Sequence, residues 1–252
     1  MKALKVKVYG KTAHFKKPDV NSYCYFSYNH ISKVHLLGML GAIIGLGGYS
    51  KQFETGSDYP EFYEKLKNLR VSILPRKKNN GIHSKKIQVF NNQFGYVDSY
   101  KNVNNLIVQE QWLEDVEWEI IIDMESDVEK EILNKIEEYI LNRKTEYIPY
   151  LGKNDHFANL SEMEIIDINE NNSLKKVKSL FYYEDFDLRD DDIEDLFSKD
   201  SELGFTFKDY MPCELNKENM YVLKKIGHTN RTVKCKNESK IYEYNGSGIC
   251  FI

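Results

Sequence analysis

The chain has 252 residues, of which 41% are hydrophobic and 29% charged, and its net charge at pH 7 is −4. This composition is typical of a folded globular protein and excludes a disordered, collagen-like or coiled-coil chain. The charge is unevenly distributed: residues 1–101 carry 17 Lys+Arg against 6 Asp+Glu (+11), and residues 102–252 carry 18 against 33 (−15). We therefore expect the first part to meet an anion and the rest to keep the whole in solution.

Cysteine usage and apolar stretches further limit the class of protein. The four cysteines include no CxxC pair, which excludes a zinc pattern and a disulfide framework and favours a reduced, cytoplasmic setting. The N-terminal decapeptide MKALKVKVYG has no apolar core and is not a signal peptide. Residues 34–50 are uncharged, but they include five glycines and are shorter than the ~20 residues of a membrane span, so no membrane contact is expected.

The first part of the chain predicts a strand, a basic loop and a glycine-rich helix. Residues 3–9 alternate between apolar and polar side chains, as a half-buried strand does, and a loop rich in Lys and Tyr follows over residues 10–30. Ser32 is suited to N-cap a helix over about 33–46. The helix carries three glycines on one side, which indicates close packing against the sheet or a partner backbone: Gly38, Gly41 and Gly45.

The middle of the chain predicts an extended hairpin and a second helix. A strand at 70–75 follows a short helical or irregular piece. Strands at 86–90 and 105–112 flank turn residues and aromatic residues, which is typical of a long hairpin that projects from the body. After a further strand at 118–123, Ser126 and Glu129 have the spacing of a capping box, and the helix they begin runs to about residue 143.

The pattern of elements predicts an α+β fold. Strands are expected at 164–169 and 177–183, an acidic surface insertion at 184–202, and further short strands over 205–252. Through about residue 170 the order is strand, helix, strand, hairpin, strand, helix, strand, which is that of a ferredoxin-like, RRM-like domain. We therefore expect such a domain over residues 1–170, with the hairpin at about 86–112, and a β-rich extension over residues 171–252.

Three groups of cations and rings in the first part are candidates for RNA binding, because cations neutralise phosphates and flat rings stack on bases. A structural alternative exists for each: a solvated loop, a solvated charged face, and rings folded back into the core. The two basic groups lie near the ends of different strands, so we expect them to line one groove. The first group is Lys11, His14, Lys16, Lys17, Tyr23 and Tyr25; the second is Arg76, Lys77, Lys78, Lys85 and Lys86; the third, at the hairpin tip, is Phe94 and Tyr96.

The sequence predicts no catalytic, metal or cofactor site. Its six histidines have no metal-ligand spacing such as HExxH, and there is no GxSxG, P-loop or GxGxxG motif. His35 in the first helix is near the position at which metal-free ribonucleases of this general architecture can place a general base, but a lone His in an apolar helix is more often a packed core residue. The carboxylates at 190–192 are interpreted as a solvated turn, because consecutive side chains point in different directions.

Three segments resemble motifs of the CRISPR-associated Cas-five family. Residues 10–18, GKTAHFKKP, resemble its GxxAxFxxP opening, and residues 37–45, LGMLGAIIG, resemble its glycine-rich first helix. Residues 150–156, YLGKNDH, resemble its LGR-type segment, with Lys153 in place of the usual Arg. The similarity spans nearly the whole chain and is greatest to the subtype of type I-B systems. It adds Lys153 and His156 to the candidate RNA-binding residues.

The resemblance implies a RAMP fold in which the predicted hairpin is a projecting thumb. It implies a subunit of a Cascade surveillance complex that grips the 5′ repeat-derived handle of the CRISPR RNA and caps the backbone of Cas-seven subunits. Such a subunit contacts the large subunit that reads the target's flanking motif, and so lies near target DNA. A separate Cas-six endoribonuclease cuts the precursor in type I-B systems, so a non-catalytic role in antiviral defence is expected.

Two alternatives stay open. The first is a metal-independent endoribonuclease that activates the 2′-hydroxyl of repeat RNA with a His or Lys, because the sister subtype I-C uses a Cas-five protein in this way. Its groups would come from Tyr49, His83, Lys85 and Lys86. The second is a structural assembly protein whose contact with RNA is incidental.

Overall fold

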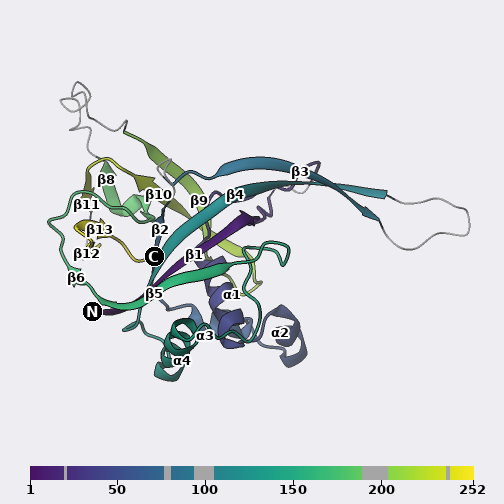
Figure 1. Ribbon diagram of the computed structural model, residues 1–252, viewed down its shortest axis with the longest axis horizontal. Coiled ribbons are helices and arrows are strands. Elements are labelled where there is room, and N and C mark those ends of the chain that lie inside the picture. The colour runs from purple at the N-terminus through teal and green to yellow at the C-terminus, as the bar shows by residue number, and fades with distance from the viewer. Residues whose placement is uncertain (20–21, 77–80, 94–104, 189–203, 237–238) are drawn as a thin grey trace, which may run out of the picture.

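The computed structural model describes residues 1–19, 22–76, 81–93, 105–188, 204–236 and 239–252. Within these residues the chain forms an α+β fold with several antiparallel sheets (Figure 1). None of the described helices is both long and apolar enough to cross a lipid bilayer. The helices are α1 (Lys33–Ile44), α2 (Tyr49–Thr55), α3 (Glu61–Leu66), α4 (Lys130–Leu141) and a short 3-10 helix η1 (Tyr183–Asp185).

A five-stranded antiparallel sheet forms the centre of the molecule. Across it the order is β2-β4-β1-β5, and β3 pairs with the outer part of β4. The helices lie below this sheet in Figure 1, and β3 and β4 project beyond the body to the right. We call residues 84–91 and 107–114 of these two strands the ribbon base. The bounds are β1 (Lys2–Ala13), β2 (Val71–Pro75), β3 (Ser84–Gln93), β4 (Asn105–Asp123) and β5 (Asn159–Asp167).

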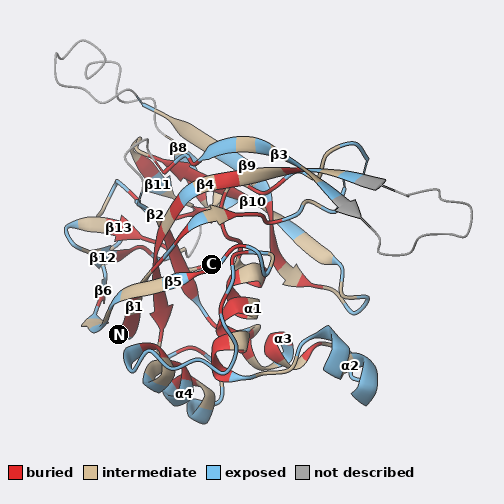
Figure 2. Ribbon diagram, turned by 45° about the vertical axis from the view of Figure 1, so that its right-hand side comes forward, coloured by how far each residue is buried: buried red, intermediate tan, exposed pale blue. Residues whose placement is uncertain are grey.

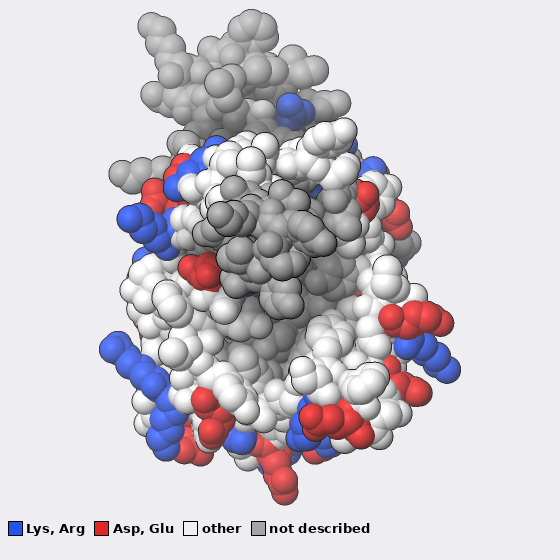
Figure 3. All heavy atoms as spheres, turned by 90° about the vertical axis from the view of Figure 1, so that its right-hand side faces the viewer, with Lys and Arg blue, Asp and Glu red and all other residues white. Residues whose placement is uncertain are grey.

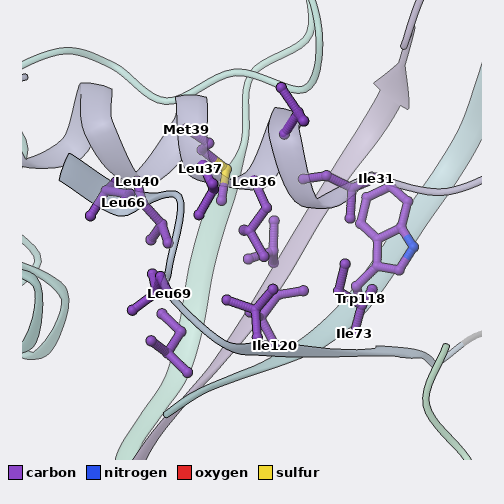
Figure 4. Close-up of a cluster of buried hydrophobic side chains, with 14 of the residues drawn as sticks. Ile31, Leu36, Leu37, Met39, Leu40, Leu66, Leu69, Ile73, Trp118 and Ile120 are labelled. Carbon is purple, nitrogen blue, oxygen red and sulfur yellow. The ribbon is translucent and has the colours of Figure 1, made fainter. Parts of the chain in front are cut away.

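The core lies between the sheet and the helices. Alternate residues of a strand point to the same face, so Trp118 and Ile120 of β4 both face α1. Leu36, Leu37 and Leu40 of α1 lie opposite them (Figure 4), and all five side chains are at most 1% exposed. Burial of a side chain of this size contributes about 1.5–3 kcal/mol. Figure 2 shows this buried layer running along the centre of the sheet and the inner side of α1.

Local signals predicted the start of α1 correctly, and the helix ends two residues before the predicted residue 46. The hydroxyl of Ser32 accepts a hydrogen bond from the backbone N–H of His35, as an N-cap does, and Gly45, with φ +80°, is the C-cap. The glycine side of α1 packs closely, but against α3 rather than the sheet. A Cβ at Gly41 would lie 2.5 Å from Cβ of Phe62, so this position requires glycine.

Strands β1, β3 and β4 are longer than predicted. The first strand continues through Ala13 instead of ending at residue 9, because residues 10–13 keep their pairing with β4. The predicted strands at 105–112 and 118–123 are two parts of the single strand β4. This continuity carries the sheet from the core into the ribbon base without an intervening loop.

The predicted capping box of the second helix is wrong. The hydroxyl of Ser126 donates to the carbonyl of Asp123 and accepts from the backbone N–H of Arg70, so it serves a contact between β2 and β4. Glu129 is itself the N-cap of α4, without a side-chain capping bond, and its carboxylate pairs with Lys65 of α3. A tertiary contact has therefore replaced the local one.

After β5 the chain forms three small antiparallel sheets. Strands β9 and β10 add Met211, Cys213, Leu215 and Ile226 to the buried cluster that contains α1, so this part shares the core of the main sheet. The predicted strand at 177–183 is reduced to β7, and most of the predicted acidic insertion, residues 189–203, lies outside the described residues. The sheets are β7 (Phe181–Tyr182) with β10 (Tyr221–Thr229) and β9 (Thr206–Leu215); β8 (Phe186–Leu188) with β11 (Val233–Cys235); and β6 (Asn169–Glu170) with β12 (Tyr242–Tyr244) and β13 (Ser247–Ile249).

Candidate nucleic-acid interface

Two sequence motifs that lie far apart along the chain meet at the ribbon base. The segment 10–18 runs from the end of β1 into the loop that follows, and the backbone of Tyr25 in that loop pairs with Gln109 and Gln111 of β4 at 2.8 and 2.9 Å. The segment 150–156 joins from the other side, because the backbone N–H of His14 donates to the carbonyl of Leu151 at 3.1 Å. Both segments therefore border the same strand.

Gly152 allows this close approach. Its φ is +90°, and a Cβ there would lie 2.0 Å from the carbonyl oxygen of His14. Only glycine fits such a position without moving the backbone. The result is that Lys153, the next residue, is held beside the ribbon base.

Lysine ammonium groups lie over aromatic rings at this place. The Nζ of Lys16 is 3.8 Å from the ring centre of Tyr25. Lys86 lies 5.7 Å from the ring of Trp112, and Lys153 lies 5.7 Å from the ring of Phe90. Such pairs combine the two groups that single-stranded nucleic acids bind, a cation for the phosphate and a ring for the base.

Carboxylates already hold several of these lysines. Glu110, which is buried, accepts hydrogen bonds from Lys153 at 2.7 Å and from the indole N–H of Trp112 at 2.9 Å. Burial alone would raise the pKa of Glu110, but these two hydrogen bonds outweigh it and lower the pKa. Lys86 pairs with Glu114 at 3.2 Å. An incoming phosphate therefore competes with a carboxylate for each of these two lysines.

The structure brings Lys17 of the first basic group to Lys85 of the second. Lys17 pairs with Asp209 of β9 at 3.2 Å. Burial of the Lys85 ammonium group lowers its pKa, the charge of Lys17 lowers it further, and Asp209 opposes the shift. The predicted groove therefore forms in part, around these three residues, with Lys11 and Lys16 exposed on the adjoining segment.

The rest of the second group does not join them. Arg76 pairs with Glu119 at 3.2 Å and with Glu162 at 2.9 Å. Glu119 lies on the face of the sheet opposite Trp118, because consecutive strand residues alternate, so the prediction that Arg76 lines the shared groove is wrong. Residues 77–78 of this group, Lys77 and Lys78, lie outside the described residues.

Two predicted RNA contacts are structural histidines. His14 and His156 are each 1% exposed, so neither reaches an RNA. The Nδ1 of His14 bonds the carbonyl of Gln111 at 3.0 Å, and the Nδ1 of His156 bonds the hydroxyl of Thr12 at 2.7 Å. Burial lowers the pKa of His14 and lowers that of His156 to about 4, so both rings are neutral at pH 7. They pack the two motif segments together.

Tyr23 is the most exposed of the predicted aromatic residues. Its side chain is 97% exposed, and its φ of +64° is unusual for a bulky residue. Backbone strain of this kind concentrates at functional sites, which keeps Tyr23 as a candidate beside the half-buried Tyr25. The two predicted hairpin-tip rings, Phe94 and Tyr96, lie outside the described residues.

The sequence analysis missed Trp112. Its ring lies against Lys86 and 4.7 Å from the ring of His156, and its N–H fixes Glu110. A usable signal was present, because Glu110 and Trp112 alternate along the predicted strand 105–112, and Glu114 continues the same spacing, so the three share one face of β4. An aromatic residue between two acids on a strand opposite a lysine-rich strand indicates such a cluster.

Of the groups considered for catalysis, His83 is buried, whereas the half-buried His35 and the exposed Tyr49 line one pocket beside α1. His35 lies between the rings of Phe15 and Tyr221, and burial lowers its pKa to about 4. His83 packs against His30 and Trp118 in the core. Among the described residues no group of three or more His, Cys, Asp or Glu side chains is placed to hold a metal ion.

Part of the uneven charge of the chain is balanced within the fold. Cations from residues 1–101 pair with acids from residues 102–252 on several elements, and that the basic part meets an anion stays a prediction. Figure 3 shows charges of both signs interspersed around the face that it presents. The pairs are Lys2–Glu137, Lys5–Glu164, Lys7–Glu117, Lys17–Asp209, Lys65–Glu129, Arg70–Asp123, Arg76–Glu119 and Lys86–Glu114.

Comparison with solved structures finds 52 chains that match this one. No family model and no curated protein matches the chain. The chain is similar to a CRISPR protein from Archaeoglobus fulgidus, at 14% identity over 100% of each chain with a TM-score of 0.49. It is also similar to a chain of a CRISPR RNA-guided surveillance complex, at 9% identity over 92% of this chain and 91% of that chain, with a TM-score of 0.48. A third similarity is to a chain of the Type III-B Cmr-beta structure bound to cognate target RNA and AMPPnP, at 13% identity over 91% and 86% with a TM-score of 0.44.

Proposed function

We propose that the chain is a non-catalytic subunit of a type I-B CRISPR surveillance complex that binds the 5′ repeat-derived handle of the CRISPR RNA. The observation that carries the proposal is the convergence of the two Cas-five-like segments, 10–18 and 150–156, on the ribbon base. There they present lysines stacked on aromatic rings. In this role the protein caps the Cas-seven backbone, contacts the large subunit near the target DNA, and works in the cytoplasm.

The strand order supports the RAMP part of the proposal. Both β2 and β3 pair with β4, so together they act as one strand in two stretches. The chain then reads strand, helix, strand, strand, helix, strand, which is the ferredoxin-like and RRM-like pattern. In this interpretation the projecting β3 and β4 are the thumb, and residues 171–252 are the β-rich extension.

RNA binding should depend on salt through a small number of cations. Lys11, Lys16, Lys17 and Lys85 are candidates at or beside the ribbon base, and four phosphate contacts predict a log–log slope of about −2.8, from roughly −0.7 per phosphate on a single strand. Lys16→Gln and Lys85→Gln should each reduce the magnitude of the slope by about 0.7. Titration of labelled repeat RNA between 50 and 300 mM salt measures this, with Lys65→Gln as the control.

Lys65 lies on α3 and pairs with Glu129, away from the ribbon base. If Lys65→Gln changes the slope as much as Lys16→Gln does, binding is spread over the surface and the proposed interface is wrong. If neutralising Lys16 and Lys85 changes neither RNA binding nor assembly with the other subunits and guide RNA, the structural assembly role is the better description.

The purified protein should leave repeat RNA intact. His83 is buried in the core, and the ring nitrogens of the half-buried His35 already lie against the hydroxyls of Ser32 and Tyr221, at 2.7 and 3.5 Å, so neither ring is placed to activate a 2′-hydroxyl. Incubation for several hours in EDTA, followed by gel analysis, tests this expectation. Cuts at one site that disappear in Tyr49→Phe or His83→Gln would establish the endoribonuclease alternative instead.

A further inference from the structure

A pocket of about 660 Å³ lies beside α1, away from the lysines discussed above. Its walls come from five parts of the chain: α1 with the turn after it, the start of α2, Phe62 of α3, the segment 147–152 and Tyr221 of β10. On α1, Gly38 lies at the pocket. Tyr150 and Gly152 of segment 150–156 line this pocket, but none of the candidate RNA-binding lysines does.

Aromatic side chains surround the pocket and stay exposed. Tyr49, Tyr147 and Tyr150 line it with exposed fractions of 49%, 64% and 45%. Phe53, one turn after Tyr49 on α2, is 92% exposed. Contiguous exposed apolar surface of this kind marks interaction sites, because each ring loses contact with water when a partner covers it.

Two glycines at the pocket have open space where a Cβ would lie. A Cβ at Gly38 would meet only Cε2 of Phe62, at 3.8 Å, and a Cβ at Gly48 would meet nothing within 4 Å. Neither has the positive φ that glycine alone tolerates well, whereas Gly41 on the same helix is fixed by a contact of 2.5 Å. Glycine weakens a helix interior by about 1 kcal/mol relative to alanine, so the bare backbone at Gly38 leaves room for an external group.

The charged groups around the pocket indicate which class of molecule can bind in it. Among the described residues that line it, Lys51 is the one with a charged side chain, and it pairs with Glu61 at 2.9 Å. Burial lowers the pKa of His35 to about 4, so that ring is neutral at pH 7. Glu54 and Asp58 are exposed nearby. Such a site repels phosphates, while few charges and many aromatic rings are the composition of a protein interface core.

We infer that this pocket is a docking site for another polypeptide, which inserts one or two bulky apolar side chains between the tyrosines and against Gly38. The inserted segment carries basic residues beside its apolar ones, facing Glu54 and Asp58. The inference rests on the proposed function in one respect, that the protein works in a complex with other polypeptides. It assigns the docking to a surface separate from the ribbon base.

The test uses a displayed library of random 16-residue peptides selected on the full-length protein. Selected peptides are then synthesised, and their affinities are measured for the parent, Gly38→Leu and Asn134→Leu. Leucine at 38 fills the pocket, whereas Asn134 is exposed on α4, where the same side chain touches nothing in the pocket. We expect peptides rich in Leu, Met or Phe with flanking Lys or Arg, bound about tenfold or more weakly by Gly38→Leu and equally by Asn134→Leu.

Three further measurements keep the result decisive. Gly38→Leu should melt no lower than the parent, because leucine is the better helix former, and Phe53→Ala, which removes an exposed ring, should weaken the same peptides. Repeat-RNA affinity should stay unchanged in both variants and fall in Lys16→Gln, so failure of RNA binding and failure of docking are seen separately.

Three outcomes overturn the inference. Selected peptides that bind the parent and Gly38→Leu equally show that the pocket is not the docking site. A loss of RNA affinity in Gly38→Leu, with peptides unaffected, shows that a nucleobase occupies it. A dimer of the parent in sedimentation velocity that becomes a monomer in Gly38→Leu shows that the occupant is a second copy of this chain.

Discussion

Replacing Gly152 by alanine should lower the free energy of unfolding by about 3 kcal/mol. Strain of the left-handed backbone contributes about 1–2 kcal/mol, and overpacking by the new Cβ contributes about 1–3 kcal/mol. The new Cβ would lie 2.0 Å from the carbonyl oxygen of His14, and backbone atoms cannot give way as a flexible side chain does. For a chain of this length the loss corresponds to roughly 10 °C in melting temperature. Thermal and urea unfolding of the variant measure it.

Gly56→Ala is the matched control. Gly56 also has a positive φ, +66°, but a Cβ there would meet nothing within 4 Å. It should therefore cost only the backbone strain, about 1–2 kcal/mol. If the two variants unfold alike, the contact between residues 14 and 152 contributes nothing and the two motif segments are not locked together as described. Gly152→Ala should also weaken RNA binding, because Lys153 follows it.

Acidification should destabilise the protein steeply between pH 6.5 and pH 4. Burial lowers the pKa of His156 and of His228 from 6.5 to about 4 in the folded state. Between these pH values the unfolded chain binds protons that the folded chain does not, so stability is complete above 6.5 and is lost as the pH falls. At 1.36 kcal/mol per unit, each ring contributes about 3 kcal/mol of this loss. Urea unfolding at pH 7, 6, 5 and 4.5 measures it.

The buried rings of His30 and His83 lie next to His228, with ring centres of His30 5.4 Å from His83 and 6.3 Å from His228. Burial, and then the charges of these two neighbours, lower the pKa of His30 well below its usual value. His228→Gln should therefore reduce the pH dependence by about one proton, or 1.36 kcal/mol per pH unit. An unchanged slope would mean that His228 is not the titrating group.

Local sequence patterns predicted the features that depend on contacts between residues close together in the chain. Ser32 caps α1 because its hydroxyl needs only the N–H three residues on. Ser126 carried the same type of signal but serves Arg70, 56 residues away, so its local pattern misled. The burial of His14 and His156 follows from the pairing of residues 14 and 151, which periodicity does not reveal.

The distribution of charge along the sequence likewise did not reveal which charged residues lie together in the fold. A sum over residues 1–101 records how many cations the segment has, not which acids they face in the fold. Arg76 and Lys85 are nine positions apart, yet one belongs to an ion-paired face of the sheet and the other lies beside Lys17. The resemblance singled out segments 10–18 and 150–156, and the fold shows that they are neighbours.

Strand β4 gives the protein two separate optical reporters. The chain has two tryptophans, Trp112 and Trp118, and both lie on this strand. Trp112 is half-buried at the ribbon base beside Lys86 and His156, so its fluorescence emission should change when a ligand binds there. Trp118 is fully buried against Phe15 and His83, so its fluorescence emission should change when the protein unfolds. Replacing one indole by phenylalanine leaves a spectroscopic probe of either ligand or fold, without attaching a dye.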